Sequence, residues 1–265
     1  MFRLKLASCM AENSERFCHA VARYINEQLG VSTEYVTGIP WQERERLFDD
    51  GDIHILWLCG LPYIQKADTS AQDIELLAVP IPDGERYLGR PVYFSDIVVR
   101  RHSPYQTLLD LRGAAWAYNE PRSHSGYNVV RAYLSEFGQN EAFFSEVLES
   151  GAHTTSLEMV LRGTVDGTAI DSTVLEWIVA ERNHVAGRIR VIDTIGPSPI
   201  PPWVISTRVP ETLRTDVRGS LLAMDQDSFG SDVLANGRIE RFSEALDNDY
   251  DPIRRMARAA ERVAL

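Results

Sequence analysis

The chain has 265 residues, with 27 lysines and arginines against 38 aspartates and glutamates, so its net charge is −11 at pH 7. This acidic excess argues against a nucleic-acid-binding protein, whose affinity depends on a basic surface. Hydrophobic residues at 44% and charged residues at 25% are ordinary for a globular protein, and the length suits two modest domains.

The first ninety residues alternate between strand and helix patterns. Strands are predicted over residues 3–8, 31–36, 53–58 and 74–79, and helices over residues 15–29 and 41–48. Strands that alternate with helices indicate a parallel sheet. Residues 60–63 are predicted to turn the chain at the carboxyl end of strand 53–58, which is the edge where open α/β sheets bind ligands.

The segment 91–100 is extended and is predicted to lead the chain from a first lobe into a second. The pattern then restarts, with strands over 115–118, 146–149, 167–170 and 188–192 and helices over 126–137, 156–161 and 172–180. The second block is therefore also predicted to be α/β.

A proline-rich segment, residues 196–203, is predicted to form the second crossover, because proline lacks the amide donor that a helix needs. The tail that follows is predicted to contain a strand over 204–206 and helices over 211–224, 226–234 and 252–263. We expect this tail to return to the first lobe. The predicted division is therefore residues 1–92 plus 203–265 for lobe 1 and residues 93–202 for lobe 2.

No membrane-spanning helix is predicted, because the longest uncharged runs are broken by glycine and proline and fall short of about 20 apolar residues. No secretory signal follows Met1. The protein is expected in the cytoplasm if Met1 is the native start, and in the periplasm or at the cell surface if a leader was removed. Cys9, Cys18 and Cys59 are expected to be reduced thiols, since their number is odd and no CxxC occurs.

The start of the helix after residues 118–122 is a candidate anion site. A helix N-terminus offers free amides and about half a positive charge. The hydroxyls of Ser123 and Ser125 add donors, and Gly126 allows an oxyanion to approach the backbone. The alternative is that one serine only caps the helix, which serine does well. Two serines and a glycine exceed what capping needs, and both interpretations stay open.

Further candidates lie at other element ends. His153 precedes a second helix that Thr154, Thr155 or Ser156 can cap, so its imidazole is not needed as a cap and could donate to an anion. The alternative is a surface loop histidine. Asp171 ends a buried strand, where capping is the favoured interpretation and pairing with an ammonium group the alternative. Tyr63 and Tyr93 are expected to line a cleft, although most buried aromatic residues are simply core.

The sequence argues against the common enzyme classes. Ser125, His153 and Asp171 have the residue types of a hydrolase triad, but the serine does not lie in a GxSxG turn. No phosphate-binding GxxxxGK[ST] loop, GxGxxG fingerprint or HExxH helix occurs. We therefore predict no catalytic residue, no metal site and no cofactor.

Four segments of the chain together carry a family resemblance: residues 91–99, 108–116, 118–127 and 150–153. They resemble the phosphonate and phosphite substrate-binding proteins of ABC transporters. The resemblance implies an α/β, two-lobed type II periplasmic-binding-protein fold, with two crossover strands at a hinge and the ligand in a cleft between the lobes.

The resemblance also implies roles for single residues. In the family, a serine loop holds the oxyanion, and this loop corresponds to Ser123, Ser125 and Gly126. The family's histidine corresponds to His153, and its crossover tyrosine corresponds to Tyr93. Two assignments go beyond these matched positions. Asp171 is the candidate partner for the amine of an aminoalkyl phosphonate, and His124, which departs from the family's usual loop, is expected to extend the anion preference or to face solvent.

The leading hypothesis is a non-enzymatic solute-binding protein that captures a small oxyanion, such as phosphonate, phosphite or phosphate, by closure of its lobes. It is expected to be a monomer that serves an ABC-type permease, binds no nucleic acid and does not span the membrane. One alternative is a cytoplasmic enzyme that uses the same cleft, with His153 as acid or base. Another is a cytoplasmic ligand sensor that passes closure to a partner protein.

Overall fold

The structure is a computed structural model that describes residues 3–70, 73–139 and 142–265. The chain forms two compact units. Unit 1 consists of Met1–Val92 and Pro199–Tyr250, and unit 2 consists of Tyr93–Ser198 and Asp251–Leu265. The chain therefore passes between the units three times, once more than the sequence pattern predicts.

Unit 1 is built on a six-stranded sheet with the order β11-β4-β10-β3-β1-β2. Its strands are β1 (Leu4–Ser8), β2 (Thr33–Tyr35), β3 (Ile55–Trp57), β4 (Ile74–Pro82), β10 (Trp203–Ser206) and β11 (Ile239–Ser243). Strand β1 is parallel to β2 and β3, whereas β10 is antiparallel to both β3 and β4. Strand β3 is central, which explains its apolar run, since both faces are covered.

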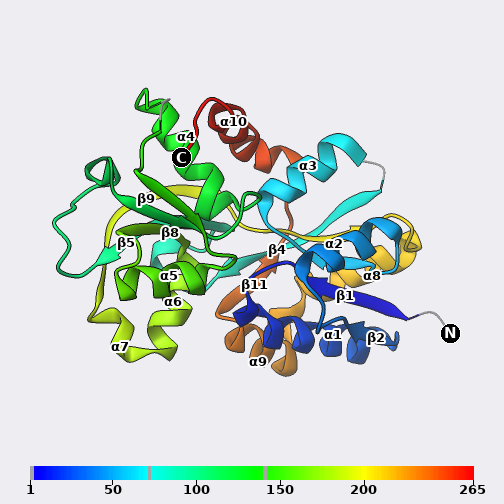
Figure 1. Ribbon diagram of the computed structural model, residues 1–265. Coiled ribbons are helices and arrows are strands. Elements are labelled where there is room, and N and C mark those ends of the chain that lie inside the picture. Colours follow the sequence, from blue (N-terminus) through cyan, green and yellow to red (C-terminus); the bar gives the residue numbers. More distant parts are fainter. Residues whose placement is uncertain (1–2, 71–72, 140–141) are drawn as a thin grey trace. The chain divides into compact units, whose positions relative to one another are not determined.

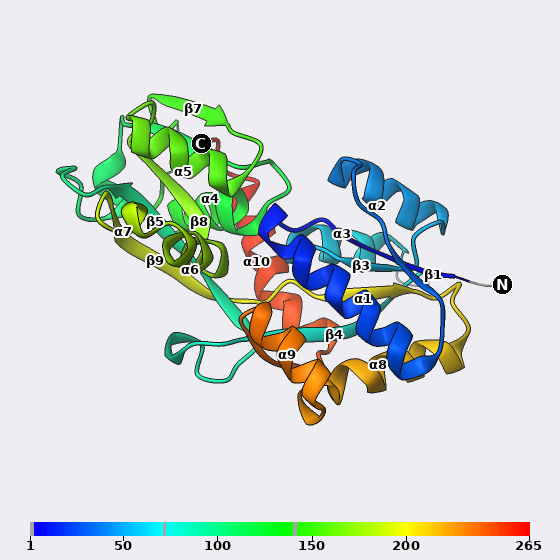
Figure 2. The ribbon, with the colours of Figure 1, turned by 90° about the horizontal axis from the view of Figure 1, so that it is seen from below.

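Helices cover both faces of the sheet of unit 1 (Figures 1 and 2). On one face lie α1 (Glu15–Leu29), α8 (Glu211–Leu222) and α9 (Ser228–Asn236), and on the other lie α2 (Trp41–Asp50) and α3 (Gly60–Ser70). Helix α1 buries the apolar positions that the sequence pattern identifies, Phe17, Val21 and Ile25, and ends at Gly30, whose φ of 64° is left-handed. Short helical turns are η1 (Glu12–Ser14), η2 (Glu85–Tyr87), η5 (Met224–Gln226) and η6 (Asp247–Tyr250).

The predicted turn over residues 60–63 is wrong, because this segment is the first turn of α3. Pro62 does not prevent the helix from forming there. The first four N–H groups of a helix have no partner within the helix, so a proline in that turn removes no hydrogen bond. Strand β11, which pairs with β4, is a further element that the helical interpretation of the tail missed.

Unit 2 has a five-stranded sheet with the order β7-β6-β8-β5-β9. The strands are β5 (Val92–Arg100), β6 (Ala115–Tyr118), β7 (Glu146–Glu149), β8 (Gly167–Asp171) and β9 (Ile189–Pro199). Strand β6 is parallel to β7 and β8, so the carboxyl ends of these three strands share one edge. Strand β5 is antiparallel to β8 and places Ser95 opposite Asp171 at that edge.

The helices of unit 2 lie on both faces of its sheet (Figure 1). One face carries α4 (Val129–Glu136) and α10 (Asp251–Ala260), and the other carries α5 (His153–Arg162), α6 (Ser172–Glu181) and α7 (Asn183–Ala186). A single-turn π-helix, η4 (His124–Asn128), leads directly into α4, and a 3₁₀ turn, η3 (Leu108–Leu111), precedes β6.

The C-terminal helix does not return to unit 1 as the sequence pattern predicts. Helix α10 packs against α4, and the segment Asp251–Leu265 belongs to unit 2. Val263 is 1% exposed within the hydrophobic cluster that includes Val129 and Leu134. The backbone oxygen of Val263 also accepts a 2.7 Å hydrogen bond from Nε of Arg131. The packing of α10 on α4 and the burial of Val263 place this segment in unit 2. The amphipathic pattern of the helix alone could not reveal this partner.

Within residues 3–70, 73–139 and 142–265, no helix combines the length and apolarity required to cross a membrane. Cys9, Cys18 and Cys59 take part in no disulfide among the described residues; Cys18 is buried, and Cys9 and Cys59 are half-buried.

Candidate functional site

The site candidates of unit 2 gather at the edge where the carboxyl ends of β6 and β8 lie. The segment that follows β6 leads into η4, β7 is followed by α5, and β8 is followed by α6. Each of these three connections leads to a helix N-terminus, where the first amides have no partner within the helix. This edge therefore concentrates hydrogen-bond donors in unit 2.

Ser123 is the N-cap of η4, since its Oγ accepts a 3.1 Å hydrogen bond from the backbone N–H of Gly126. The capping interpretation of this serine is confirmed. Its backbone oxygen also accepts a hydrogen bond from the N–H of Asn128 at 3.0 Å. Ser123 thus uses both oxygens to shape the loop.

Ser125 does not cap the helix. Its Oγ lies 3.0 Å from Nε2 of His153, and both side chains are buried, with 3% and 7% exposed. His153 is the first residue of α5, not a loop residue before a later helix start as the sequence pattern suggests. Ser125 and His153 are 28 positions apart in the sequence, and their contact joins the N-termini of η4 and α5.

Burial lowers the pKa of His153 to about 4, against the opposing effect of a hydrogen bond with the backbone of Ala169. The imidazole is therefore neutral near pH 7 and has one donor and one acceptor nitrogen. A neutral histidine beside a serine hydroxyl provides polar contacts without a fixed counter-charge. Hydroxyls, helix amides and a neutral imidazole suit an anion that is held by hydrogen bonds.

Gly126 is required by space, not by backbone conformation. A Cβ at this position would lie 1.9 Å from Oδ1 of Asn119 and 3.2 Å from Cε1 of His153. Asn119 directly follows β6 and is 9% exposed, and Oδ1 is buried with no hydrogen-bond partner among the described residues. The serine loop is thus packed closely on both neighbouring connections.

His124 neither faces solvent nor reaches outward from the loop. Its side chain is 0% exposed, Nε2 lies 3.1 Å from Oγ of Ser198, and Nδ1 lies 3.0 Å from Nδ2 of Asn128. The expectation of a solvent-facing side chain is wrong. The position inside η4 directs this side chain into unit 2, while the neighbouring Ser125 meets His153.

Asp171 is the N-cap of α6, as the favoured interpretation has it. Its Oδ1 accepts hydrogen bonds from the backbone N–H and the hydroxyl of Thr173 at 2.8 and 2.7 Å. Burial raises the pKa of the carboxyl to about 6, opposed by these hydrogen bonds, and the charge of nearby Asp96 acts in the same direction as burial.

The two candidate tyrosines lie in different units. Tyr93 belongs to unit 2, is fully buried and meets the ring of His124 edge-on at 6.4 Å between centroids. Tyr63 belongs to unit 1, where its hydroxyl donates a 2.8 Å hydrogen bond to Asp247 and its ring packs on Tyr250 at 4.6 Å.

Three residues at this site escaped the sequence interpretation: Asn119, Asn128 and Ser198. The position of Asn119 directly after a strand could have marked it, because ligand sites of α/β sheets lie at strand carboxyl ends. Asn128 lies inside a helix, and Ser198 is 74 positions from His124, so no local pattern connects them.

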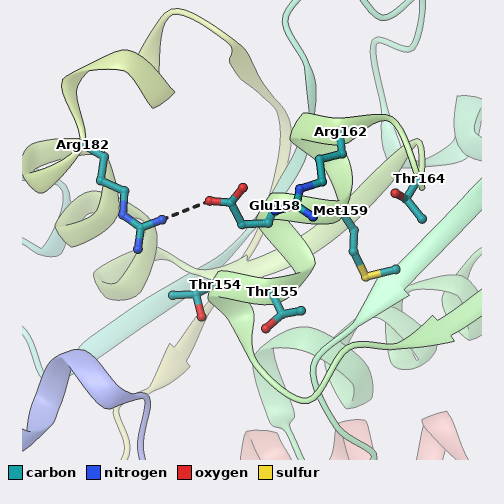
Figure 3. A pocket seen from close by; sticks show the side chains of 7 residues that line it. All are labelled: Thr154, Thr155, Glu158, Met159, Arg162, Thr164 and Arg182. Carbon is teal, nitrogen blue, oxygen red and sulfur yellow. Dashed lines mark hydrogen bonds and ion pairs between the residues drawn. The ribbon is translucent and has the colours of Figure 1, made fainter.

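A separate hollow of about 400 Å³ lies on the outer side of α5 (Figure 3). Arg182 and Glu158 form a 3.1 Å ion pair beside it, and threonines and Arg162 complete much of its wall. None of the candidate site residues lines this hollow. Across the described ranges, no three histidine, cysteine or acidic side chains are grouped as metal ligands.

Two solved structures share the fold over almost the whole chain. A binding protein of an ABC phosphonate transporter from Pseudomonas aeruginosa has a TM-score of 0.84 at 16% identity, with 98% of this chain and 86% of that chain covered. PhnD1 from Prochlorococcus marinus, in complex with methylphosphonate, has a TM-score of 0.83 at 16% identity, with 98% and 99% covered.

An ancestral arginine-binding protein is also similar, with a TM-score of 0.63 at 15% identity and 88% and 96% of the two chains covered. These likenesses confirm the type II periplasmic-binding-protein fold. The family model of the phosphonate periplasmic substrate-binding proteins of ABC transporters matches residues 9–250. The chain therefore belongs to this family, whose members bind a substrate for transport and are not enzymes.

Proposed function

We propose that this protein captures a small phosphorus oxyanion, a phosphonate, phosphite or phosphate, at the edge of unit 2 where the serine loop meets α5. The contact between Ser125 Oγ and His153 Nε2 at 3.0 Å carries the proposal. It brings a hydroxyl, an imidazole and two helix N-termini together in a buried setting. Each of these groups favours a bound oxyanion.

The proposed ligand contacts are Ser123, Ser125, the amide region of Gly126 and His153. Tyr93 and Asp171 are proposed to border the same edge, since Tyr93 lies at the start of β5 and Asp171 at the end of β8. With a pKa of about 6, Asp171 is suited to accept a hydrogen bond from an O–H or ammonium group of the ligand. Tyr63, which belongs to unit 1, is kept as a proposed ligand contact on the basis of the sequence alone.

Phosphonates are the first ligand class to test. The family match supports this choice, as does the methylphosphonate bound to the Prochlorococcus marinus relative. We further propose that the protein works outside the cytoplasm and delivers its ligand to an ABC permease, as its family membership suggests. Immunoblotting of periplasmic and cytoplasmic fractions of the source cells tests the location.

Calorimetric titration of the ligand-stripped protein tests the binding proposal. The anions are phosphate, phosphite, methylphosphonate, 2-aminoethylphosphonate and sulfate. At least one phosphorus anion should bind at micromolar affinity or better, about −8 kcal/mol. Ser125→Ala should weaken this binding by roughly 1.5–3 kcal/mol, the value of a hydrogen bond to a charged group.

Ser135→Ala is the matched control, because Ser135 is a half-buried serine in the last turn of α4, away from the loop. Its affinity should stay within about twofold of the wild type, or about 0.4 kcal/mol. Absence of heat with every anion would refute the proposed function. Equal affinity of the wild type and Ser125→Ala would restrict the loop to a capping role.

A further inference from the structure

The side chain of His124, in the serine loop (residues 123–126), is directed into the interior of unit 2. It lies between Ser123 and Ser125 in sequence, yet its ring is 0% exposed. Both ring nitrogens have partners inside the unit, Ser198 Oγ at 3.1 Å and Asn128 Nδ2 at 3.0 Å. A buried histidine with two such contacts is rigidly held.

The chemistry of its partners fixes which nitrogen carries the proton. Burial lowers the pKa of His124 to about 3, so the ring is neutral at ordinary pH. The Nδ2 group of Asn128 is a donor, which makes Nδ1 of His124 the acceptor. Nε2 then carries the hydrogen and donates it to Oγ of Ser198.

Ser198 is a distant anchor for this bond. It lies in β9, is 1% exposed, and is the last residue of unit 2 before the chain enters unit 1. The hydrogen bond spans 74 positions and connects the start of η4 with the end of β9.

We infer that His124 is a positioning residue that ties the serine loop to β9 through Ser198 and thereby holds Ser125 against His153. This inference rests on the proposed function, because the geometry it maintains is that of the proposed anion site. Both ring nitrogens of His124 are engaged by Ser198 and Asn128, so the proposed role does not require contact with the anion. Its contribution is to order the loop before a ligand arrives, which lowers the entropy cost of binding.

Loss of the hydrogen bond between His124 and Ser198 should weaken anion binding, although every proposed anion contact is still present. Ser198→Ala and His124→Leu should each reduce the affinity for methylphosphonate about threefold to tenfold, the range for one neutral hydrogen bond. In the double variant the two losses should not add, since both substitutions remove the same bond. His124→Gln retains an amide donor in place of Nε2 and should restore much of the affinity.

Thr194→Val is the matched control. Its hydroxyl also belongs to β9 but donates a 2.9 Å hydrogen bond to Asp96, not to the serine loop. The control should keep the affinity of the wild type. Unchanged affinity in Ser198→Ala, or additive losses in the double variant, would overturn the inference.

A second readout does not require a ligand. The imidazole ¹⁵N and ¹H signals of His153 in the ligand-free protein report its contact with Ser125. These signals should move in Ser198→Ala and stay in place in Thr194→Val. If they stay in place in both, the inference fails, even where the wild type binds an anion. If they move as expected but no anion binds, the proposed function fails and the positioning role stands.

Discussion

Gly126→Ala is expected to destabilise unit 2 and to abolish anion binding at the serine loop. The added methyl group would lie 1.9 Å from Oδ1 and 3.0 Å from Cγ of Asn119, and 3.2 Å from Cε1 of His153. Both of these side chains are at least nine-tenths buried. Neither can withdraw toward solvent without a shift of the loop.

The expected cost comes from overpacking alone. Gly126 is not among the described glycines with positive φ, so alanine adopts its backbone conformation without strain. Overpacking of a well-packed interior typically costs about 1–3 kcal/mol. We expect the upper part of this range, because the shortest contact is far below any normal carbon–oxygen distance.

A double-variant cycle tests this origin of the cost. Asn119→Ala removes Cγ and Oδ1, the atoms that make the two shortest contacts. In the Asn119→Ala background, Gly126→Ala should therefore cost at least about 1 kcal/mol less than in the wild type. Urea unfolding followed by circular dichroism measures the four free energies, and anion titration measures the recovery of the site.

Gly187→Ala serves as the control in the same unit. No atom lies within 4 Å of a Cβ there, and its φ of −74° suits alanine. It should be neutral or stabilise the protein by about 0.4–1 kcal/mol. Equal costs of Gly126→Ala with and without Asn119 would show that steric conflict with Asn119 is not the cause.

Three further predictions concern stability and reactivity. Burial lowers the pKa of His124 to about 3 and of His153 to about 4, so the unfolded chain takes up these protons first. The free energy of unfolding should therefore fall as the pH drops below about 6.5, the pKa of both histidines in the unfolded chain. His124→Gln should reduce the slope of this fall by up to about 1.4 kcal/mol per pH unit between pH 6 and 4. An unchanged slope in unfolding experiments would contradict a buried, neutral His124 ring. Burial raises the pKa of Cys18 to about 12, so a thiol reagent should modify Cys18 only after unfolding, whereas Cys9 and Cys59 should react first. Peptide mapping after treatment of the native protein measures this order, and modified Cys18 in the native protein would contradict the prediction. Ile253→Ala removes most of a fully buried side chain of α10 and should cost about 2–5 kcal/mol of unfolding free energy. A cost below about 1 kcal/mol would contradict the burial of this side chain.

The sequence predicted the alternation of strands and helices well, because each element carries its own periodicity. The repeat of apolar residues in 15–29 marked α1, and the apolar run in 53–58 marked the central strand β3. The prediction failed where local signals conflicted. Gly60 and Pro62 suggested a turn, although the first turn of a helix accepts both residues.

The placement of the tail could not be predicted from its pattern. The stripe of α10 shows that one face must be buried, but not against which partner. Contacts between Val263 and the cluster around Val129 decide the matter, and they join residues that are more than a hundred positions apart. Such long-range packing leaves no local signature.

The serine loop and His153 were identified from their positions at helix starts, and the structure brings Ser125 and His153 into contact. The direction of each side chain was beyond the sequence. Ser123, His124 and Ser125 are consecutive, yet one caps, one points inward and one meets α5. This division depends on the π-helical turn η4, which changes the angle between successive side chains.

The three passages of the chain between the units constrain the order in which they can be completed during synthesis. Unit 1 lacks β10, the strand that joins β3 to β4, until residues 203–206 have left the ribosome. Unit 2 lacks α10, which packs against α4, until residues 251–260 have also been made. Neither unit can therefore reach its final form before a segment distant in sequence has been synthesised.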